Sequence, residues 1–254
     1  MLENELSEIC GIHAGDGYLR NDGRRIELDI SGSTEEKIYY DKHVTPLFSK
    51  VFGVKIEGRY FPHRNTYGFV VRDLKTVEKI HSLGFPYGKK TNIVKVPEFV
   101  LKSENLEPKK LFLRGFFDTD GCITFDRRYS DSYSLFRRKH HIYPRIILVT
   151  TSYSLFTDLK KIITDAGIGF WVDEYTPKSE NESKKFRIWI RGRNVEKWMN
   201  VIGSKNPIKH SRFDVWKRYG FCPPKTTFKE RMKIISGSIN PENIQRARSS
   251  TGNK

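Results

Sequence analysis

The alternation of apolar and polar residues predicts the same series of elements twice along the chain. After residue 17, two alternating runs joined by the turn residues 21–23 predict a β-hairpin over 18–31. Apolar positions three and four apart predict helices, and strict alternation predicts strands. In the first half these elements follow in the order helix 34–53, strand 54–62, strand 65–72 and helix 73–84. Both helical runs end in glycine, which is typical of a helix C-terminus.

The second half repeats this order after residue 121. Its predicted elements are strand 122–128, strand 143–151, helix 152–167, strand 169–177, strand 184–192 and helix 193–203. The first hairpin carries an insertion over 129–142, and the first long helix is shorter than its counterpart. The polar stretch 103–110 contains a proline and is typical of a linker. A repeat of this length indicates gene duplication and a pseudo-twofold arrangement rather than a solenoid.

A nine-residue motif opens each half, "ICGIHAGDG" at 9–17 and "LRGFFDTDG" at 113–121. Both motifs have glycine at the third place, aspartate at the eighth and glycine at the ninth. On a helix the third and seventh places share a face, and small residues there allow two backbones to pack closely. The sequence therefore predicts that the two motif helices meet through Gly11 and Gly115.

Each motif places an aspartate, Asp16 or Asp120, at the C-terminal end of its helix, where the helix dipole is already negative. Two carboxylates brought together there repel each other unless a cation intervenes. Oxygen ligands favour Mg²⁺, Mn²⁺ or Ca²⁺ over zinc. Paired metal sites below a basic surface are typical of phosphodiester hydrolysis, because the metals activate water and stabilise the leaving oxygen. For a single motif, a tight core contact ending in a glycine cap is the simpler interpretation.

The amino-acid composition limits the kinds of partner that the chain could bind. The chain has 46 Lys and Arg against 30 Asp and Glu, a net charge of +16, which indicates nucleic acid or an anionic membrane surface. No apolar run approaches a membrane span and no basic amphipathic helix with an aromatic face stands out, so the membrane is the weaker alternative. The three cysteines lack the spacing of structural zinc or of a disulfide framework. The acidic N-terminus is unlike a signal peptide, so we expect an intracellular protein, in the cytoplasm of a prokaryote or in an organelle.

Over roughly residues 5–220 the chain resembles the LAGLIDADG homing endonucleases in their single-chain form with two motifs. The resemblance implies an α+β fold in which two pseudo-symmetric αββαββα repeats form a DNA-binding β-saddle, with the motif helices at the interface. It implies a first repeat over 1–102, a linker over 103–110, a second repeat over 111–220 and a basic C-terminal extension over 221–254. The first motif departs from the family at His13 and Ala14, but Asp16 is intact.

The resemblance also implies a metal site. Asp16 and Asp120 would bind divalent ions, Mg²⁺ in the first place, with Mn²⁺ or Ca²⁺ able to occupy the same sites. The main-chain carbonyls of Gly15 and Thr119 would help to bind them.

Members of the family carry a basic residue after the second helix of each repeat, near the metals and the attacking water. Lys90 and Lys209 match this place best and are the predicted catalytic partners of the two aspartates. Lys89 and His210 are the alternatives in each repeat. A solvated surface lysine is an equally good interpretation of either position.

In such a saddle, alternate side chains of the strands point into the major groove. Because Ile26, Leu28 and Ile30 form the apolar set of their strand, the side chains between them face the DNA. The predicted DNA-binding residues of the first repeat are Arg20, Arg24, Arg25, Glu27, Asp29, Ser31, Arg59, His63, Arg64 and Arg72. Those of the second repeat are Thr124, Arg128, Arg145 and Thr151, with Arg137 and Arg138 of the insertion. For any single arginine, a solvated strand face is the simpler interpretation.

The function implied by the resemblance is that of a monomeric, metal-dependent endonuclease that makes a double-strand break in a long, asymmetric DNA target. An intron RNA maturase, with or without nuclease activity, and a repressor that only binds DNA stay open as alternatives. Intact acids on both helices favour the nuclease. Since the first motif follows Met1 almost directly, we expect a free-standing or intron-encoded protein rather than one embedded in an intein. The sequence after residue 220 predicts a short helix followed by a basic segment.

Overall fold

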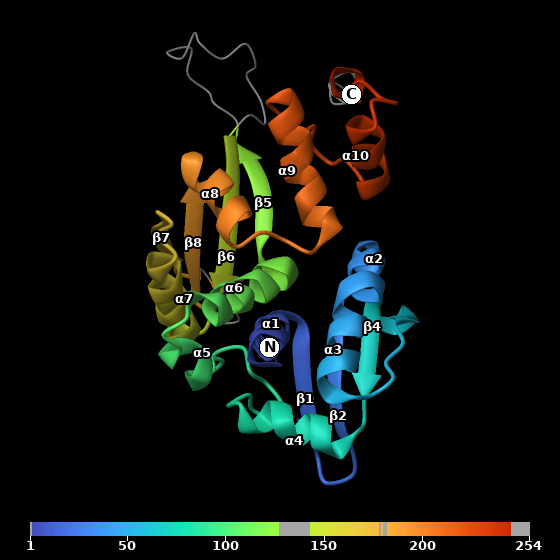
Figure 1. Cartoon of the computed structure of the whole chain (residues 1–254), viewed down its shortest axis with the longest axis vertical. Coiled ribbons are helices and arrows are strands. Elements are labelled where there is room, and N and C mark those ends of the chain that lie inside the picture. The colour runs from blue at the N-terminus through green and yellow to red at the C-terminus, as the bar shows by residue number, and fades with distance from the viewer. Residues whose placement is uncertain (1, 127–142, 178, 180–181, 245–254) are drawn as a thin grey trace.

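Two units with the same order of elements pack around a central pair of helices. The computed structural model of the chain describes residues 2–126, 143–177, 179 and 182–244 (Figure 1). The central helices are α1 (Leu2–Asp16) and α6 (Leu106–Asp120), which carry the two motifs and lie side by side (Figure 1). The architecture is the α+β fold with two repeats that the sequence predicts. The insertion over 129–142 lies outside the described residues.

The first unit continues with the strands β1 (Gly17–Asn21), β2 (Ile26–Ser33), β3 (Arg59–Phe61) and β4 (Thr66–Val71), with η3 (Pro62–Arg64) between the last two, and ends with α4 (Leu74–Ser82). The helix predicted over 34–53 is divided into η1 (Thr34–Glu36), α2 (Lys37–Tyr39), the π-helical η2 (Tyr40–Val44) and α3 (Thr45–Phe52). A π-helical turn inserts an extra residue and so rotates the side chains that precede it relative to a regular helix. Of the strand predicted over 54–62, only β3 pairs with a neighbour.

The second unit continues with β5 (Cys122–Asp126), β6 (Tyr143–Thr150), α7 (Tyr153–Asp165), β7 (Trp171–Tyr175), β8 (Lys185–Arg191) and α8 (Arg193–Val201). Three further helices are α5 (Glu98–Lys102), α9 (Pro207–Tyr219) and α10 (Phe228–Ile235). Because α6 already begins at Leu106, most of the polar stretch 103–110 is the first part of a helix rather than a loop. The sequence analysis did not predict α9, the helix that carries Lys209.

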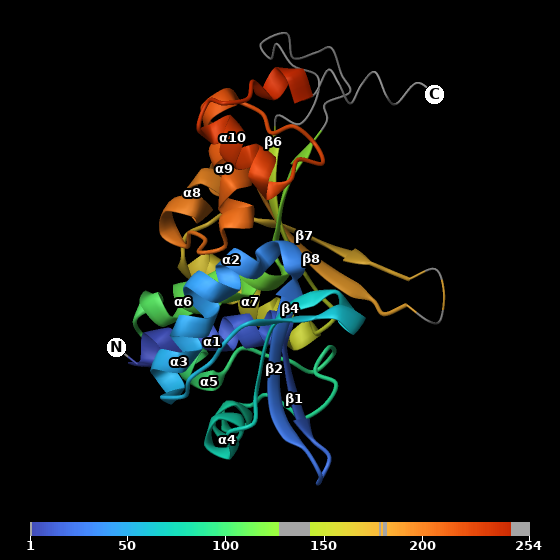
Figure 2. The ribbon, with the colours of Figure 1, turned by 90° about the vertical axis from the view of Figure 1, so that its right-hand side faces the viewer.

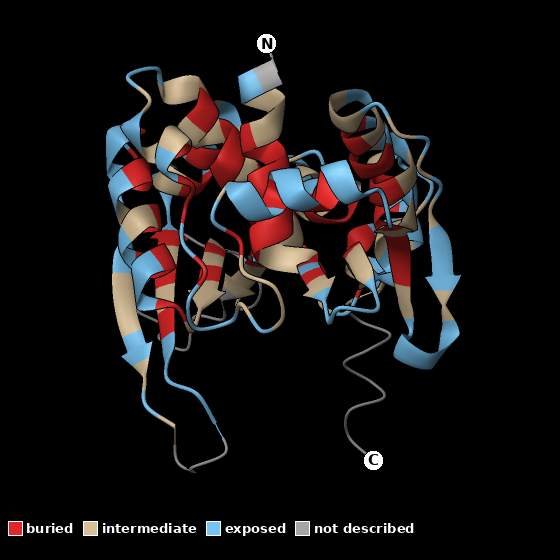
Figure 3. Cartoon of the chain, turned by 90° about the horizontal axis from the view of Figure 1, so that it is seen from below, coloured by how far each residue is buried: buried red, intermediate tan, exposed pale blue. Residues whose placement is uncertain are grey.

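Both sheets are antiparallel and have the same strand order, β1-β2-β4-β3 and β5-β6-β8-β7. The repeated order confirms the predicted duplication of one unit. Figure 2 shows most of the helices on one side of the molecule and the strands on the other. Figure 3 shows the strands on both flanks, extending away from the N-terminus, with the buried segments concentrated between them. The two sheets therefore present one face each to the same side of the molecule, as a saddle requires.

Alternation along the strands separates the core face from the outer face. On β2, Leu28 and Ile30 are fully buried, and on β8, Ile188 and Ile190 are buried in the same way. Burying each such side chain contributes about 1.5–3 kcal/mol to folding. None of the helices in the described part of the chain is long and apolar enough to cross a bilayer.

The motif helices touch through their glycines, as predicted. A Cβ atom added to Gly11 would lie 2.1 Å from the carbonyl oxygen of Phe112, and one added to Gly115 would lie 2.3 Å from that of Glu8. These distances are shorter than any van der Waals contact. The main chain of each helix therefore occupies the space that a side chain at the glycine of the other helix would need. The contact is reciprocal, which is the signature of a twofold or pseudo-twofold axis.

A buried ion pair fixes the register of the two helices. Glu8 of α1 accepts two hydrogen bonds from Arg114 of α6, at 2.9 and 2.7 Å, and Nε2 of His43 lies 2.8 Å from the same carboxylate. These partners lower the pKa of Glu8, although burial alone would raise it. Removing one member of a buried pair leaves the other charge unpaired, so the helices cannot slide without a large penalty.

Candidate active site

The two predicted metal-binding acids, Asp16 and Asp120, are the last residues of α1 and α6. A Cβ atom on Gly15 would lie 2.1 Å from Oγ1 of Thr119 and 3.4 Å from Cγ of Asp120, so the two helix ends are in contact. The hydroxyl of Thr119 turns back to the carbonyls of Gly115 and Phe116. The structure therefore brings together the two acids that the sequence singled out.

Burial disfavours the charged forms of both acids. Desolvation, together with the charges of Asp120 and Glu36, raises the pKa of Asp16 to about 7, although a hydrogen bond from Tyr40 opposes the shift. The carboxylate of Asp120 reaches solvent at the mouth of the site, yet protein surrounds it on its other sides and desolvation raises its pKa too. A bound cation would relieve both effects.

Lys90 and Lys209 each bind the end of one motif helix, as their predicted place after the second helix of each repeat requires. Nζ of Lys90 donates to the carbonyl of Gly15 at 2.7 Å. Nζ of Lys209 donates to the carbonyls of Phe117 and Thr119 at 2.6 and 2.7 Å. Lysines are favourable there because the last carbonyls of a helix carry partial negative charge.

Desolvation lowers the pKa of both lysines, and the nearby carboxylates act in the opposite direction. The alternative residues lie outside the site. Lys89 is exposed, and His210 bonds through Nδ1 to Asp214 at 2.7 Å, which raises its pKa. The structure thus favours Lys90 and Lys209 over these alternatives.

Three residues of the site escaped the sequence analysis: Glu36, Tyr40 and Asn206. The hydroxyl of Tyr40 donates to Oδ2 of Asp16 at 2.7 Å. A Cβ atom on Gly32 would meet Oδ2 of Asp16 at 2.7 Å, Oε2 of Glu36 at 2.9 Å and the Tyr40 hydroxyl at 2.9 Å, so these three oxygens converge on one glycine. Only glycine leaves room for them.

Asn206 connects the two repeats at the site. Its side-chain nitrogen donates to Oε1 of Glu36 at 2.7 Å and to the carbonyl of Asp118 at 2.8 Å. Its side-chain oxygen caps α9 by accepting from the main-chain nitrogen of Ile208. The signal in the sequence was Asn206-Pro207 followed by Gly220, which are a helix cap, a first-turn proline and a C-terminal glycine.

Asp118, the first of the two aspartates of its motif, has a structural role. Its carboxylate is fully buried and accepts from the hydroxyl of Ser204 at 2.5 Å and from the main-chain nitrogen of Lys205 at 2.7 Å. Burial raises its pKa to about 6. The residue ties the loop before α9 to α6 and so helps to place Lys209.

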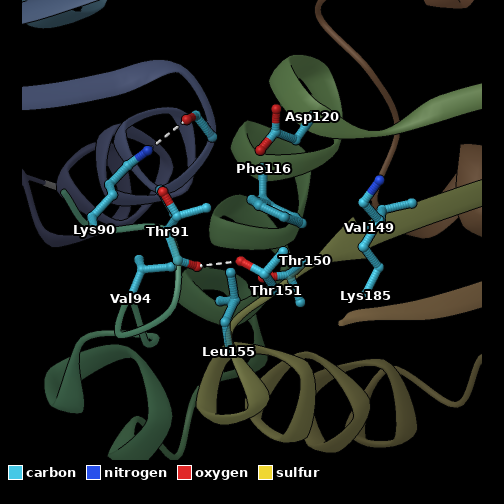
Figure 4. Close-up of a pocket in the computed structure, with 12 residues that line it drawn as sticks. Lys90, Thr91, Val94, Phe116, Asp120, Val149, Thr150, Thr151, Leu155 and Lys185 are labelled. Carbon is cyan, nitrogen blue, oxygen red and sulfur yellow. Dashed lines mark hydrogen bonds between the residues drawn. The ribbon is translucent and has the colours of Figure 1, made fainter. Parts of the chain in front are cut away.

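The site is open on one side and filled on the other. Beside Lys90 lies a pocket of about 320 Å³, lined among others by Asp120, Thr151 and Lys185 (Figure 4). Thr151 is half-buried, and its hydroxyl donates to the carbonyl of Thr91 at 2.8 Å and so joins the two repeats (Figure 4). On the other side, Tyr40 binds Asp16, Glu36 lies next to them, and Asn206 binds Glu36. The two halves of the candidate site are therefore chemically different.

The outer face of the first sheet carries the predicted alternation of acids and arginines. Arg64 binds Asp29 at 2.7 Å, and Glu27 lies between Arg72 at 3.3 Å and Arg20 at 3.7 Å. These pairs hold the charged groups in fixed positions on an open surface. The remaining predicted residues of this sheet, all exposed except the half-buried Ser31, are Arg24, Arg25, Ser31, Arg59 and His63.

The outer face of the second sheet is built from arginines stacked on aromatic rings, which the sequence analysis missed. The guanidinium of Arg191 lies 5.0 Å from the ring of Trp171 and 5.2 Å from that of Trp189, and Arg145 and Arg187 lie 4.9 and 5.7 Å from Trp189. Thr124 pairs with Arg145 across β5 and β6, on the same face. Arg128, Arg137 and Arg138 lie outside the described residues.

The raised pKa of Asp16 predicts that its negative charge destabilises the folded protein at neutral pH. The pKa of this group is 3.8 in its ordinary state and about 7 in the folded protein, so folding favours the protonated form. Its contribution to the free energy of unfolding is therefore greatest below pH 4 and is lost as the pH rises to 7. We expect Asp16→Asn to raise the Tm at pH 8 in EDTA by a few degrees, since ~1 kcal/mol corresponds to ~2–4 °C in a chain of this size.

Thermal unfolding at pH 5 and pH 8, with and without EDTA, measures this effect. The gain from Asp16→Asn should be smaller at pH 5 than at pH 8, because the wild-type carboxyl is then mostly protonated. An equal gain at both pH values would mean that the charge of Asp16 does not destabilise the folded protein.

Parts of the chain are similar in sequence to known proteins. Residues 107–203 match the family model of the LAGLIDADG-like domain. The chain is 28% identical over 200 residues to the replication factor C small subunit of Methanocaldococcus jannaschii, which is 78% of this chain but only 9% of the length of that protein. The matched relative is far longer than this chain, and the free-standing form expected from the sequence stays a prediction.

The fold matches solved structures of the homing endonuclease I-DmoI. Its mesophilic variants superpose with a TM-score of 0.54 at 15% identity, over 80% of this chain and 96% of theirs. Its complex with DNA and Mn has a TM-score of 0.54 at 15% identity, over 80% and 98% of the two chains. Its complex with DNA and Ca has a TM-score of 0.52, again at 15% identity, over 79% and 90%. The family-model match thus covers the second repeat, and the chain as a whole has the duplicated fold, with paired motif helices, of the single-chain LAGLIDADG homing endonucleases.

Proposed function

We propose that the protein is a site-specific DNA endonuclease that acts as a monomer and hydrolyses one phosphodiester bond in each strand. The observation that carries the proposal is the pair of acids at the touching ends of α1 and α6, each with a lysine beside it. The net charge of +16 supports a polyanionic substrate. The likeness in fold to I-DmoI, which has been solved with DNA, supports DNA as that substrate.

The residues of the site fit a hard divalent cation such as Mg²⁺. Asp16 and Asp120 would hold it, and the carbonyl oxygens of Gly15 and Thr119, which keep a second lone pair beside the lysines, are further donors. Among the described residues no cluster of three or more His, Cys, Asp or Glu side chains forms a complete metal site. Water and phosphate oxygens would complete the ligand set, as is usual for Mg²⁺. The bound metal would activate water and stabilise the leaving oxygen.

The protein's own groups orient the substrate around that centre. Lys90 and Lys209 hold the helix ends in place and keep an ammonium group beside the phosphate, where it stabilises negative charge in the transition state. Tyr40 fixes the position of the Asp16 carboxylate by its hydrogen bond. The two sheets align the duplex across the site, and the β-saddle buries the reacting phosphates against the motif helices.

The two outer faces differ, so we expect the target to be asymmetric. The first sheet offers arginines and carboxylates, which discriminate guanine and cytosine through hydrogen bonds in the major groove. The second offers Trp171 and Trp189 with stacked arginines, and apolar surface there favours thymine methyl groups. Because the two faces differ, the two half-sites of the target should differ in sequence, and the target should not be a palindrome.

Cleavage of a randomised duplex library tests the proposed function. With Mg²⁺ we expect one long, asymmetric sequence to be enriched among the products, and with EDTA we expect no products. Cleavage at unrelated sequences, cleavage in EDTA, or an intact library at every protein concentration would contradict the proposal.

Binding to the enriched target should weaken steeply with salt. Each Lys or Arg that neutralises a phosphate releases a condensed counterion, and the slope of log K against log salt is about −0.9 for each such contact. An extended saddle with several contacts predicts a slope several times that value. Anisotropy titrations with Ca²⁺ at a series of salt concentrations measure it, and a slope near zero would argue against binding across both sheets.

RNA binding is a second candidate function, favoured by an exposed aromatic ring on the second sheet. Trp171 of β7 is 54% exposed, and the guanidinium of Arg191 lies against its ring. Proteins that bind unpaired RNA bases use such rings as stacking platforms. A splicing assay with a candidate host intron, run beside DNA cleavage, distinguishes a maturase from a nuclease.

A further inference from the structure

The C-terminal extension packs against the helix that carries Lys209. α10 lies beside α9 at the edge of the molecule (Figure 1). The first residue of α10, Phe228, donates its main-chain N–H to the carboxylate of Glu35 at 3.0 Å, which connects the extension to the first repeat. Ile234 of α10 is fully buried together with Val215 of α9. The extension thus spans from one repeat to the other on the Lys209 side of the site.

Arg231 of α10 is fully buried and its guanidinium contacts the first turn of α9. Nε donates to the hydroxyl of Ser211 at 2.9 Å, and one terminal nitrogen donates to the carbonyl of Ile208 at 3.2 Å. The other terminal nitrogen binds the carbonyl of Thr226. Ile208 and Ser211 flank Lys209 in the sequence, so Arg231 fixes the backbone on both sides of the site lysine.

A buried guanidinium is costly, because desolvation penalises its charge and lowers its pKa. Here its hydrogen-bond acceptors are two carbonyls and a hydroxyl rather than a carboxylate. A well-packed apolar side chain at this position would often stabilise the folded protein as well as the arginine does, or better. The rigid, planar fork of arginine has a different advantage, since it holds several acceptors in one fixed geometry.

The first turn of α9 is therefore fixed from two directions. On the inner side Asn206 binds Glu36 and the carbonyl of Asp118. On the outer side Arg231 binds Ile208 and Ser211. Between them, Lys209 extends to the end of α6. Lys90 differs, because it lies in the loop between α4 and α5 rather than on a helix.

We propose that Arg231 is a positioning residue for Lys209 and that the C-terminal extension thereby controls the cleavage of one particular strand. The inference rests on the proposed function. The two lysines lie at the ends of two helices related by a pseudo-twofold axis, and the two strands of a duplex are related in the same way, so each lysine serves one strand. Loosening the first turn of α9 slows the strand that depends on Lys209 and leaves the strand that depends on Lys90 unaffected.

Strand-resolved cleavage tests this. A duplex target from the library, with each strand labelled separately, is cut by the full-length wild type, Lys90→Met, Lys209→Met, Arg231→Met and Arg231→Lys under single-turnover conditions. Lys90→Met and Lys209→Met identify the strand that each lysine serves. We expect Arg231→Met to slow the Lys209 strand about tenfold, in the range typical of groups that orient a reacting residue, with the other strand unchanged.

Arg231→Lys should recover part of the lost rate, because it keeps the charge and one of the donors. In the double variant Lys209→Met/Arg231→Met the second change should have little further effect on that strand, since both act through one group. Arg218→Met is the matched control. Arg218 also joins α9 to α10, through the carbonyl of Ile235, but at the far end of α9 from Lys209, and its loss should leave both strands unchanged.

Equal slowing of both strands by Arg231→Met, or slowing confined to the Lys90 strand, would overturn the inference while leaving the proposed endonuclease intact. So would an effect of Arg218→Met equal to that of Arg231→Met. Should Arg231→Met fail to fold, Arg231→Lys alone decides between the one-strand and two-strand outcomes. A wild type that cuts neither strand would overturn both the inference and the proposed function.

Discussion

Replacing either motif acid, by Asp16→Asn or Asp120→Asn, should slow double-strand cleavage by at least about 100-fold, on the order that follows loss of one group stabilising transition-state charge. DNA affinity should be unchanged or slightly higher, because the variant removes a negative charge that faces the phosphates. The acids lie at the touching ends of α1 and α6, and their substitution by isosteric amides leaves the packing of the helices intact. Cleavage rates and anisotropy titrations on the same labelled target measure the two effects separately.

Asp165→Asn is the matched control for these variants. Asp165 is the last residue of α7 and pairs with Lys109 at 2.8 Å on the surface, away from the helix ends. Asp165 itself is exposed and the pair lies far from Asp16 and Asp120, so both cleavage and binding should stay at wild-type values. Full cleavage activity in the double variant Asp16→Asn/Asp120→Asn would end the catalytic assignment.

The substitution Gly11→Ala should be among the most destabilising single changes in the chain. The new Cβ would lie 2.1 Å from the carbonyl oxygen of Phe112 and 2.9 Å from the nitrogen of Phe116, and both are main-chain atoms of a helix that cannot turn aside. The helices must separate, which costs about 3 kcal/mol or more. Separation also pulls the two acids apart, so cleavage should fall with stability. Denaturant unfolding measures the first effect.

Gly53→Ala distinguishes this packing effect from the general cost of replacing glycine. Gly53 has a φ of 66° and no heavy atom near the added Cβ, so its replacement costs only the backbone strain of about 1–2 kcal/mol. It should leave cleavage unchanged, because it lies at the end of α3. If Gly11→Ala were no more destabilising than Gly53→Ala, the close approach of the motif helices would be wrong.

The repeated pattern in the sequence was sufficient to predict the two units, the contact of the motif helices and the meeting of Asp16 with Asp120. Each of these depends on spacing within one motif or on its repetition, which are local properties. The two lysines were placed by their position after a predicted helix, which the resemblance supplied. The structure agrees because α9 and the 85–97 loop return to the helix ends.

Other parts of the site depend on contacts that no local pattern reveals. Glu36 and Tyr40 reach Asp16 because the helix over 34–53 begins with a 3-10 turn and contains a π-helical segment, which change the direction of its side chains. Asn206 meets Glu36 across 170 positions of sequence. Arg231 was one basic residue among many in a basic tail, and only its burial distinguishes it.

The faces of the two sheets illustrate the same limit. Alternation predicted which residues of β2 face outward, because each strand carries its own period. It did not show that Trp171 and Trp189 lie side by side, since their pairing depends on the register between β7 and β8. The arginine–aromatic surface follows from that register.

The central claim is that the two helix ends form one shared cation site, and anomalous scattering from Mn²⁺ tests it most directly. Crystals of the protein with its selected target and Mn²⁺ should show anomalous peaks within bonding distance of the carboxylates of Asp16 and Asp120 and of the scissile phosphates. Peaks confined to other parts of the surface, or a bound and correctly placed duplex with no Mn²⁺ between the acids, would contradict it.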